Sequence, residues 1–445
     1  MTRKIIVLSV LVSQFIVSCS SSDDLNSNDL LSNNISELII KPYSALTPDE
    51  QKVKLENEAN GMLQQMEKSK TSSALEAIKN LENLLSLSSP EFQMAKSGNG
   101  LEDLLNISGI YGIYTWDSTR KIWIKTPSTT DLKFVFPAKK TATTNNATLS
   151  SSSIASNVKV SVMDTDEIGY WEYNQSTQEY NFIVTTAAIY DQIYLPSSVS
   201  AKLRIENTEV GSYIASAKYS GNNTTPTEAS HKLTLNDGYV FENNGKRTSP
   251  VSANAAFSYN DSNIIEFNVG STASIDKLIE GSELTQYLGK ANCLISLMDN
   301  FVMVADMNLE EMANSENTIA NIQTPDYNTP TYYTDSNNYN KNVSEAEVAD
   351  FNKNVKMSLV SKKDGTKLAD VIQKSEKGTG YYSNVKWDNG AWIYDATGGV
   401  FVQDYDNTLY LRFNDNTEVA MEVYFSSGFS NLETKFQDFI KSFNN

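Results

Sequence analysis

We expect an α+β fold in which a large, curved antiparallel β-sheet packs against helices, with a helical pair near the N-terminus and an amphipathic helix at the C-terminus. Three observations predict this arrangement. Runs of branched and aromatic residues, separated by turn-forming clusters, fill most of the chain after residue 108. Two segments with apolar residues at helical spacing precede these runs, and a third such segment closes the chain. An antiparallel sheet with helices on one face buries all of these apolar surfaces economically.

Residues 47–89 are expected to form the antiparallel pair of helices. Thr47 can cap the first helix, Pro48 suits its first turn, and Glu50 can bond back to the cap. An apolar stripe follows as far as Met66. After a short Ser/Thr turn, a second stripe has spacings of three and four residues, at Leu75, Ile78, Leu81 and Leu85.

The following residues, 90–445, are expected to form a β-rich α+β domain, either undivided or divided near residue 271. Its hairpin turns are marked by short Asn, Asp and Gly clusters that tolerate a positive φ angle. These clusters are Asn236-Asp237-Gly238, Asp364-Gly365, Asp388-Asn389-Gly390 and Asn414-Asp415-Asn416. A strand over Glu418–Phe425 is expected to follow the last of them. The hairpin Cys293–Met307 is apolar on both faces, which indicates central strands covered on both sides.

Helices are expected within the β-rich region over residues 275–288 and 309–319. Residues 322–342 are rich in Asn, Tyr and Thr and show no apolar period, so we expect a surface loop there. The closing segment from Leu432 to Phe443 carries one continuous apolar stripe. This stripe predicts an amphipathic helix that lies against the preceding sheet.

The first 18 residues have the features of a cleaved secretory signal. Arg3 and Lys4 precede an apolar core that is short for a bilayer span, which needs about 20 residues. Ile16-Val17-Ser18-Cys19 then resembles the lipobox of bacterial lipoproteins, which implies cleavage before Cys19 and acylation of that cysteine. The polar stretch behind it, residues 19–46, is expected to be a flexible tether.

The charge balance argues against nucleic acid as a partner. The chain holds 36 Lys and Arg against 54 Asp and Glu, a formal net charge of −18. Such a surface repels phosphate backbones. With Cys19 acylated, Cys293 is the only remaining cysteine, so no internal disulfide can form, and we expect Cys293 to be a small buried hydrophobe.

Catalytic and metal-binding patterns are scarce. His231 is the only histidine, which excludes zinc sites built on several histidines, and no Gly-x-Ser-x-Gly elbow accompanies it. We therefore expect no catalytic residues, no metal site and no cofactor. An acid-pair hydrolase that acts on glycans remains an alternative, because sequence cannot show which carboxylates face each other.

Paired tryptophans provide the candidate ligand-binding residues: Trp116 with Trp123, and Trp387 with Trp392, each pair flanking a polar turn. Aromatic residues that face each other across a hairpin stabilise it. Exposed indoles could instead stack on the apolar face of a sugar ring. The Met-containing hairpin Cys293–Met307 offers a second interpretation, in which Leu297 and Met303 line a lipid cavity.

The lipobox, the helix start Leu46–Lys52 and the segment Tyr424–Phe429 together resemble a group of uncharacterised Bacteroidota envelope lipoproteins. The serines and paired aspartates behind Cys19 are similar to the surface-export signal of such proteins, and Ser20 differs from the aspartate that often retains lipoproteins at an inner membrane. This resemblance implies an outer-membrane protein, held by lipid on Cys19, that faces the periplasm or the cell surface. It implies no established activity.

These observations favour a non-enzymatic envelope lipoprotein that binds a ligand or partner, with a glycan ahead of a lipid. The acid-pair hydrolase is one alternative to this function, and a structural or assembly lipoprotein is another.

Overall fold

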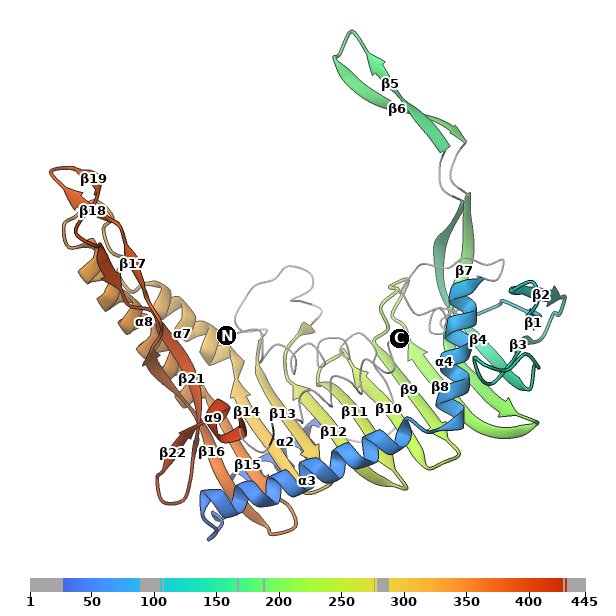
Figure 1. Cartoon of the computed structure of the whole chain (residues 1–445), viewed down its shortest axis with the longest axis horizontal. Helices are drawn as coiled ribbons and strands as arrows, with labels where there is room; N and C mark the ends of the chain where they lie inside the picture. The colour runs from blue at the N-terminus through green and yellow to red at the C-terminus, as the bar shows by residue number, and fades with distance from the viewer. Residues whose placement is uncertain are drawn as a thin grey trace.

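The computed structural model describes residues 27–88, 108–165, 168–186, 189–275 and 288–426, together with three isolated positions. It confirms the α+β class, with a large, mostly antiparallel sheet that packs against helices (Figure 1). The sheet is open and does not curl into a closed surface, since its two edge strands do not pair with each other.

The described part of the main sheet has 16 strands in the order β2-β1-β3-β4-β7-β8-β9-β10-β11-β12-β13-β14-β15-β16-β21-β22. Neighbouring strands are antiparallel, except that β1 and β3 are parallel. Because β12 pairs with β13, the sheet is continuous across residue 271. The strand bounds are β1 Gly112–Asp117, β2 Ile122–Thr126, β3 Leu132–Phe136, β4 Ala147–Thr165, β7 Ile189–Ile205, β8 Thr208–Lys218, β9 Glu228–Leu235, β10 Tyr239–Lys246, β11 Val251–Tyr259, β12 Ser262–Ser271, β13 Lys290–Leu297, β14 Phe301–Asn308, β15 Val355–Ser361, β16 Thr366–Lys377, β21 Tyr405–Arg412 and β22 Glu418–Ala420.

Three two-stranded sheets project from this layer. They pair β5 Ile168–Asn174 with β6 Glu179–Thr186, β17 Tyr381–Ser383 with β20 Val400–Val402, and β18 Val385–Asp388 with β19 Ala391–Tyr394.

The predicted hairpin turns lie where the sequence placed them. The turn between β9 and β10 contains Gly238 at φ 94°, and that between β15 and β16 contains Gly365 at φ 68°. Asn389 and Gly390 turn β18 into β19 at φ 45° and 87°, and Asn416 at φ 63° separates β21 from β22. These are backbone conformations that Gly and Asn adopt at low cost, which explains why the clusters marked the turns.

The prediction of a flexible tether over residues 19–46 is wrong for residues 27–46, which begin with helix α2, Ser27–Ile39; residues 19–26 lie outside the described residues. Ile35 and Leu38 are 0% and 6% exposed and pack against Leu294, Val302, Val304 and Val360. The chain after α2 is also fixed to the sheet, because Tyr43 bridges to Lys367 and its hydroxyl donates to the carboxylate of Asp370. Residues 27–46 are therefore part of the fold.

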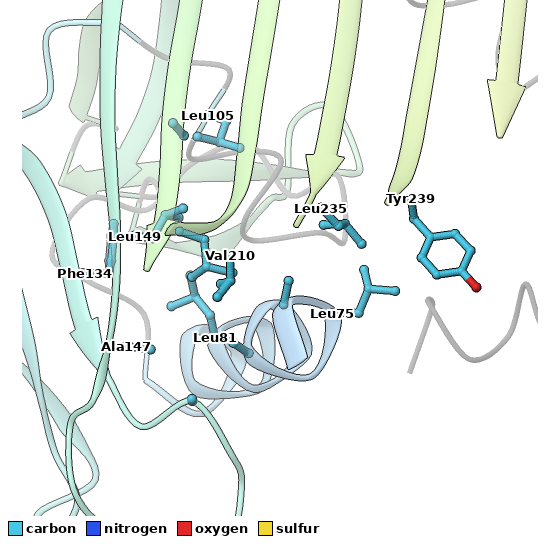
Figure 2. Close-up of a cluster of buried hydrophobic side chains, with 14 of the residues drawn as sticks. Leu75, Leu81, Leu105, Phe134, Ala147, Leu149, Val210, Leu235 and Tyr239 are labelled. Carbon is cyan, nitrogen blue, oxygen red and sulfur yellow. The ribbon is translucent and has the colours of Figure 1, made fainter. Parts of the chain in front are cut away.

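Helices α3, Pro48–Ser69, and α4, Ser73–Leu87, begin as predicted, and Thr47 and Glu50 form the expected capping box. They do not pack as an antiparallel pair, because α4 turns away from α3 and each helix lies along the sheet (Figure 1). The buried apolar residues of both helices belong to clusters that contain strand residues, so each stripe packs on the sheet. Figure 2 shows Leu75 and Leu81 of α4 in the core beside Val210, Leu235 and Tyr239.

The hairpin β13–β14 is central and covered on both faces, as predicted. Val302 packs under α2, whereas Phe301 belongs to the cluster that contains Leu55 of α3. Successive residues of a strand point to opposite faces, so α2 and α3 cover opposite sides of the sheet here.

Helix α7, Leu309–Ala320, confirms the helix predicted over 309–319, but the loop prediction for residues 322–342 is wrong beyond Thr331. Helix α8 runs over Tyr332–Asn354 and packs along β16 and β21. Its polar side chains replace the missing apolar stripe: Asn337 donates to the carbonyl oxygen of Phe401 at 3.2 Å, and Asn340 to that of Gln403 at 3.0 Å. Such bonds to distant backbone leave no period in the sequence.

The strand predicted over Glu418–Phe425 ends early, because β22 is followed by the short helix α9, Met421–Ser426. The predicted helices over 275–288 and 432–443 lie almost entirely outside the described residues. None of the described helices is both long and apolar enough to cross a bilayer.

Candidate ligand-binding site

The first tryptophan pair belongs to the core. Trp116 and Trp123 face each other across β1 and β2 with ring centroids 5.2 Å apart. Trp116 is 5% exposed, and Trp123 packs edge-on against Phe134 at 5.3 Å. These two indoles stabilise the hairpin and the core beneath it, because Trp116 is buried and the partly buried Trp123 packs against the core cluster.

The second pair lies in a different environment, at the far end of the arm formed by α7, α8 and β17–β20 (Figure 1). Trp387 and Trp392 are directly opposite on β18 and β19, with centroids 5.8 Å apart, and both are half-buried. Three tyrosines surround Trp392. We call this group the distal aromatic cluster; its members are Tyr327, Tyr332, Tyr333, Trp387 and Trp392.

The tyrosines come from the segment that joins α7 to α8 and from the start of α8. Tyr327, in the joining segment, is tilted by 33° relative to Trp392, with ring centroids 4.5 Å apart. Tyr332 and Tyr333, in the first turn of α8, meet the same indole edge-on at 5.5 and 5.6 Å. The hydroxyl of Tyr333 hydrogen-bonds to that of Ser383 at 2.6 Å, which fixes the start of α8 to β17.

One side of the cluster is open to solvent. Tyr327 is 54% exposed, and Tyr394 of β19 is 72% exposed. Because side chains alternate along a strand, Tyr394 shares a face with Trp392, and its partner Val385 shares that face with Trp387. The result is an aromatic strip from Tyr327 over the tryptophans to Tyr394, supported by α8.

Two ionisable groups beside the cluster, Lys386 and Asp395, pair with each other. Lys386 alternates with Trp387 and so lies on the opposite face of β18, where its Nζ is 3.4 Å from Asp395. The side chain and backbone amide of Thr397 hydrogen-bond to Asp395, and they lower the pKa of that carboxyl. A carboxyl held ionised in this way is not a general acid at neutral pH.

A polar depression of about 440 Å³ lies elsewhere, where α3 crosses the β13–β14 turn; its lining is Lys54, Asn57, Glu58, Asn300, Phe301, Lys363 and Asp364. It holds two carboxylates, as the hydrolase alternative requires. Each is paired with a lysine: Glu58 with Lys363 at 3.0 Å and Asp364 with Lys54 at 2.9 Å. The hydrogen bond from Lys54 lowers the pKa of Asp364. Both carboxylates of the depression are therefore engaged in ion pairs with lysines.

The remaining residues considered from sequence are packed. His231 contacts the Tyr213 hydroxyl through Nδ1 at 2.6 Å, and burial lowers its pKa. Burial raises the pKa of the Cys293 thiol to about 11. Leu297 packs against the main core, and Met303 lies between Ile295 and Leu359 in the sheet. Within the described ranges, no group of three or more potential ligands could hold a metal ion.

Comparison of the chain with protein-family models, with curated proteins and with solved structures finds no significant match. The site therefore has to be interpreted from its own chemistry.

Proposed function

We propose that this protein is an envelope lipoprotein, acylated on Cys19, which binds a glycan without catalysis at the distal aromatic cluster. The observation that carries the proposal is the strip of aromatic rings around Trp392, open at Tyr327 and Tyr394. Aromatic rings offer a flat apolar face with a polar tip, which matches a pyranose whose C–H bonds lie on one side and whose hydroxyls lie on its rim.

The negative net charge of the chain favours a neutral sugar as the ligand. A formal net charge of −18 disfavours sulfated or uronic-acid glycans. Asp326 and Asp388 stand next to Tyr327 and Trp387 in the sequence, and carboxylates accept hydrogen bonds from sugar hydroxyls. Neither the depression at Glu58 and Asp364 nor the packed side chains at Leu297 and Met303 favours the hydrolase or the lipid alternative.

A printed array of neutral oligosaccharides tests the binding. Residues 19–445 with Cys19→Ala should bind at least one glycan, and Tyr327→Ala should weaken that binding at least tenfold, because it removes an exposed ring at the open side of the cluster. Tyr111→Ala is the matched control, since Tyr111 is also an exposed tyrosine, at 44% exposure, but lies outside the cluster. Equal loss in both variants, or no bound glycan at all, contradicts the proposal.

The membrane anchor has a separate test. Cells that express the wild-type chain should incorporate a fatty-acid probe into it, and Cys19→Ala should abolish that label. Fractionation of the labelled protein to the outer membrane, and its digestion by a protease added to intact cells, test the proposed location at the cell surface. Equal label in both versions contradicts acylation at Cys19.

A further inference from the structure

The hairpin β5–β6 stands clear of the main sheet (Figure 1). Its two strands pair with each other, and no extensive contact joins them to another described element. An isolated two-stranded hairpin is marginally stable in water, so the side on which four of its five aromatic rings gather is informative.

That side is built from opposed pairs. Trp171 faces Phe182 with centroids 5.2 Å apart, and Tyr173 faces Tyr180 at 5.0 Å. The rings remain open to solvent, since Trp171 is 65%, Tyr173 47% and Tyr180 67% exposed. Val184 continues the same face and is 46% exposed.

The opposite side is mixed, because it carries Glu172 and Glu179 together with Tyr170 and Ile183. Both carboxylates point away from the side on which Trp171 and Tyr173 lie. Residues 168–186 contain no Lys or Arg, and the turn Gln175–Gln178 is uncharged. One side of the hairpin, with Trp171, Tyr173, Tyr180, Phe182 and Val184, therefore bears no charged side chain and can leave water without desolvating a charge.

We propose that the aromatic face of β5–β6 lies in the interface of a lipid bilayer. Trp and Tyr are the residues enriched at that level of a membrane, where the ring is apolar and its tip is wet. The exposed area of the face, roughly 400–500 Å² if each ring presents the usual aromatic surface, is below the ~800 Å² per partner of a stable protein interface. A second copy of the chain is therefore the weaker candidate.

The proposed anchor fits this arrangement, and in this respect the inference rests on the proposed function. Seven residues lie between Cys19 and the start of α2 at Ser27, so the chain takes eight steps from one to the other. A chain spans at most about 3.5 Å per residue, so an acyl group on Cys19 holds the body within about 28 Å of the membrane. A hairpin that stands away from the body can then reach the same surface.

The test uses residues 19–445 with Cys19→Ala, so that no acyl chain contributes. Flotation with phosphatidylcholine vesicles should carry a fraction of the protein that is unchanged between 0.1 and 0.5 M NaCl, because the hairpin has no cation to attract lipid head groups. Trp171→Ser with Tyr180→Ser should lower that fraction at least fivefold. Tyr111→Ser, an exposed tyrosine elsewhere, should leave it unchanged.

A second measurement guards against a hairpin that fails to fold in the double variant. Phosphatidylcholine brominated on its acyl chains should quench part of the tryptophan fluorescence of the wild type, and the conservative variant Trp171→Phe should lose that quenched part. Equal quenching in both proteins overturns the proposal, as does binding that requires anionic lipid, or no binding to these vesicles. Each of these outcomes leaves the glycan array and the fatty-acid label unaffected.

Discussion

Truncation of Ile35 tests whether α2 is an integral part of the fold. The side chain is 0% exposed and lies between α2 and the strands that carry Leu294, Val302 and Val360. Ile35→Ala removes three carbon atoms, which at about 0.8 kcal/mol per buried carbon is about 2.4 kcal/mol. The sheet beneath cannot move to refill the space, so the cavity raises the expected loss of unfolding free energy to about 3–4 kcal/mol.

Urea unfolding followed by tryptophan fluorescence measures this loss. Ile40→Ala is the matched control, because Ile40 comes directly after the helix and is 80% exposed; its substitution should change stability by less than about 0.5 kcal/mol. Equal unfolding midpoints for the two variants and the wild type would refute the docking of α2 and restore a tether over these residues.

Three further predictions concern the site and its surroundings. Asn337→Ala removes the hydrogen bond to the Phe401 carbonyl, at 3.2 Å, and the one from the Gln403 amide, at 2.7 Å. The substitution should lower the free energy of unfolding by roughly 1–3 kcal/mol. Faster amide exchange over residues 400–403 would show this loss. Because Lys54 lowers the pKa of Asp364, the carboxylate stabilises the fold above the ordinary Asp pKa, and this contribution is lost as the pH falls through the folded pKa. Asp364→Asn should therefore lower stability by at most about 1 kcal/mol at pH 7, since the pair is exposed, and the urea midpoints of variant and wild type should converge in strongly acidic solution; a gap that persists there would count against the ion pair. The Cys293 thiol, with a pKa of about 11, should react with iodoacetamide at pH 8 more than ~100-fold more slowly than a free thiol, and at the free rate once unfolded; fast labelling of the native protein would contradict its burial.

Most of the sheet could be predicted because its signals are local. Turns at Gly238, Gly365 and Asn389 need residues that adopt a positive φ angle, and alternating or fully apolar runs on either side specify the strands. The sequence did contain a signal against the tether, since Leu31, Ile35 and Leu38 have the spacing of one helix face. The polar composition around these three residues hid that signal.

The remaining errors have a non-local cause. The antiparallel pairing of α3 and α4 was inferred from a short connection, but their apolar stripes pack on the sheet instead. Helix α8 has no apolar stripe that the sequence could reveal. It is held to the rest of the fold by polar contacts such as the hydrogen bond from Asn337 to a backbone carbonyl more than 60 residues away. For the same reason only half of the candidate site was visible in the sequence: the cross-strand spacing of Trp387 and Trp392 was local, whereas Tyr327 reaches them only in the folded chain.

Hydroxyl-radical footprinting with and without a bound neutral oligosaccharide shows whether the glycan binds at the distal aromatic cluster. Tyr327 and Tyr394 are 54% and 72% exposed, so both should be oxidised in the free protein. A glycan bound at the cluster should protect these two tyrosines and leave Trp171 and Tyr180 of the hairpin unprotected. Unchanged oxidation of Tyr327 and Tyr394 at a saturating concentration of a glycan that binds would contradict a binding site at the distal aromatic cluster.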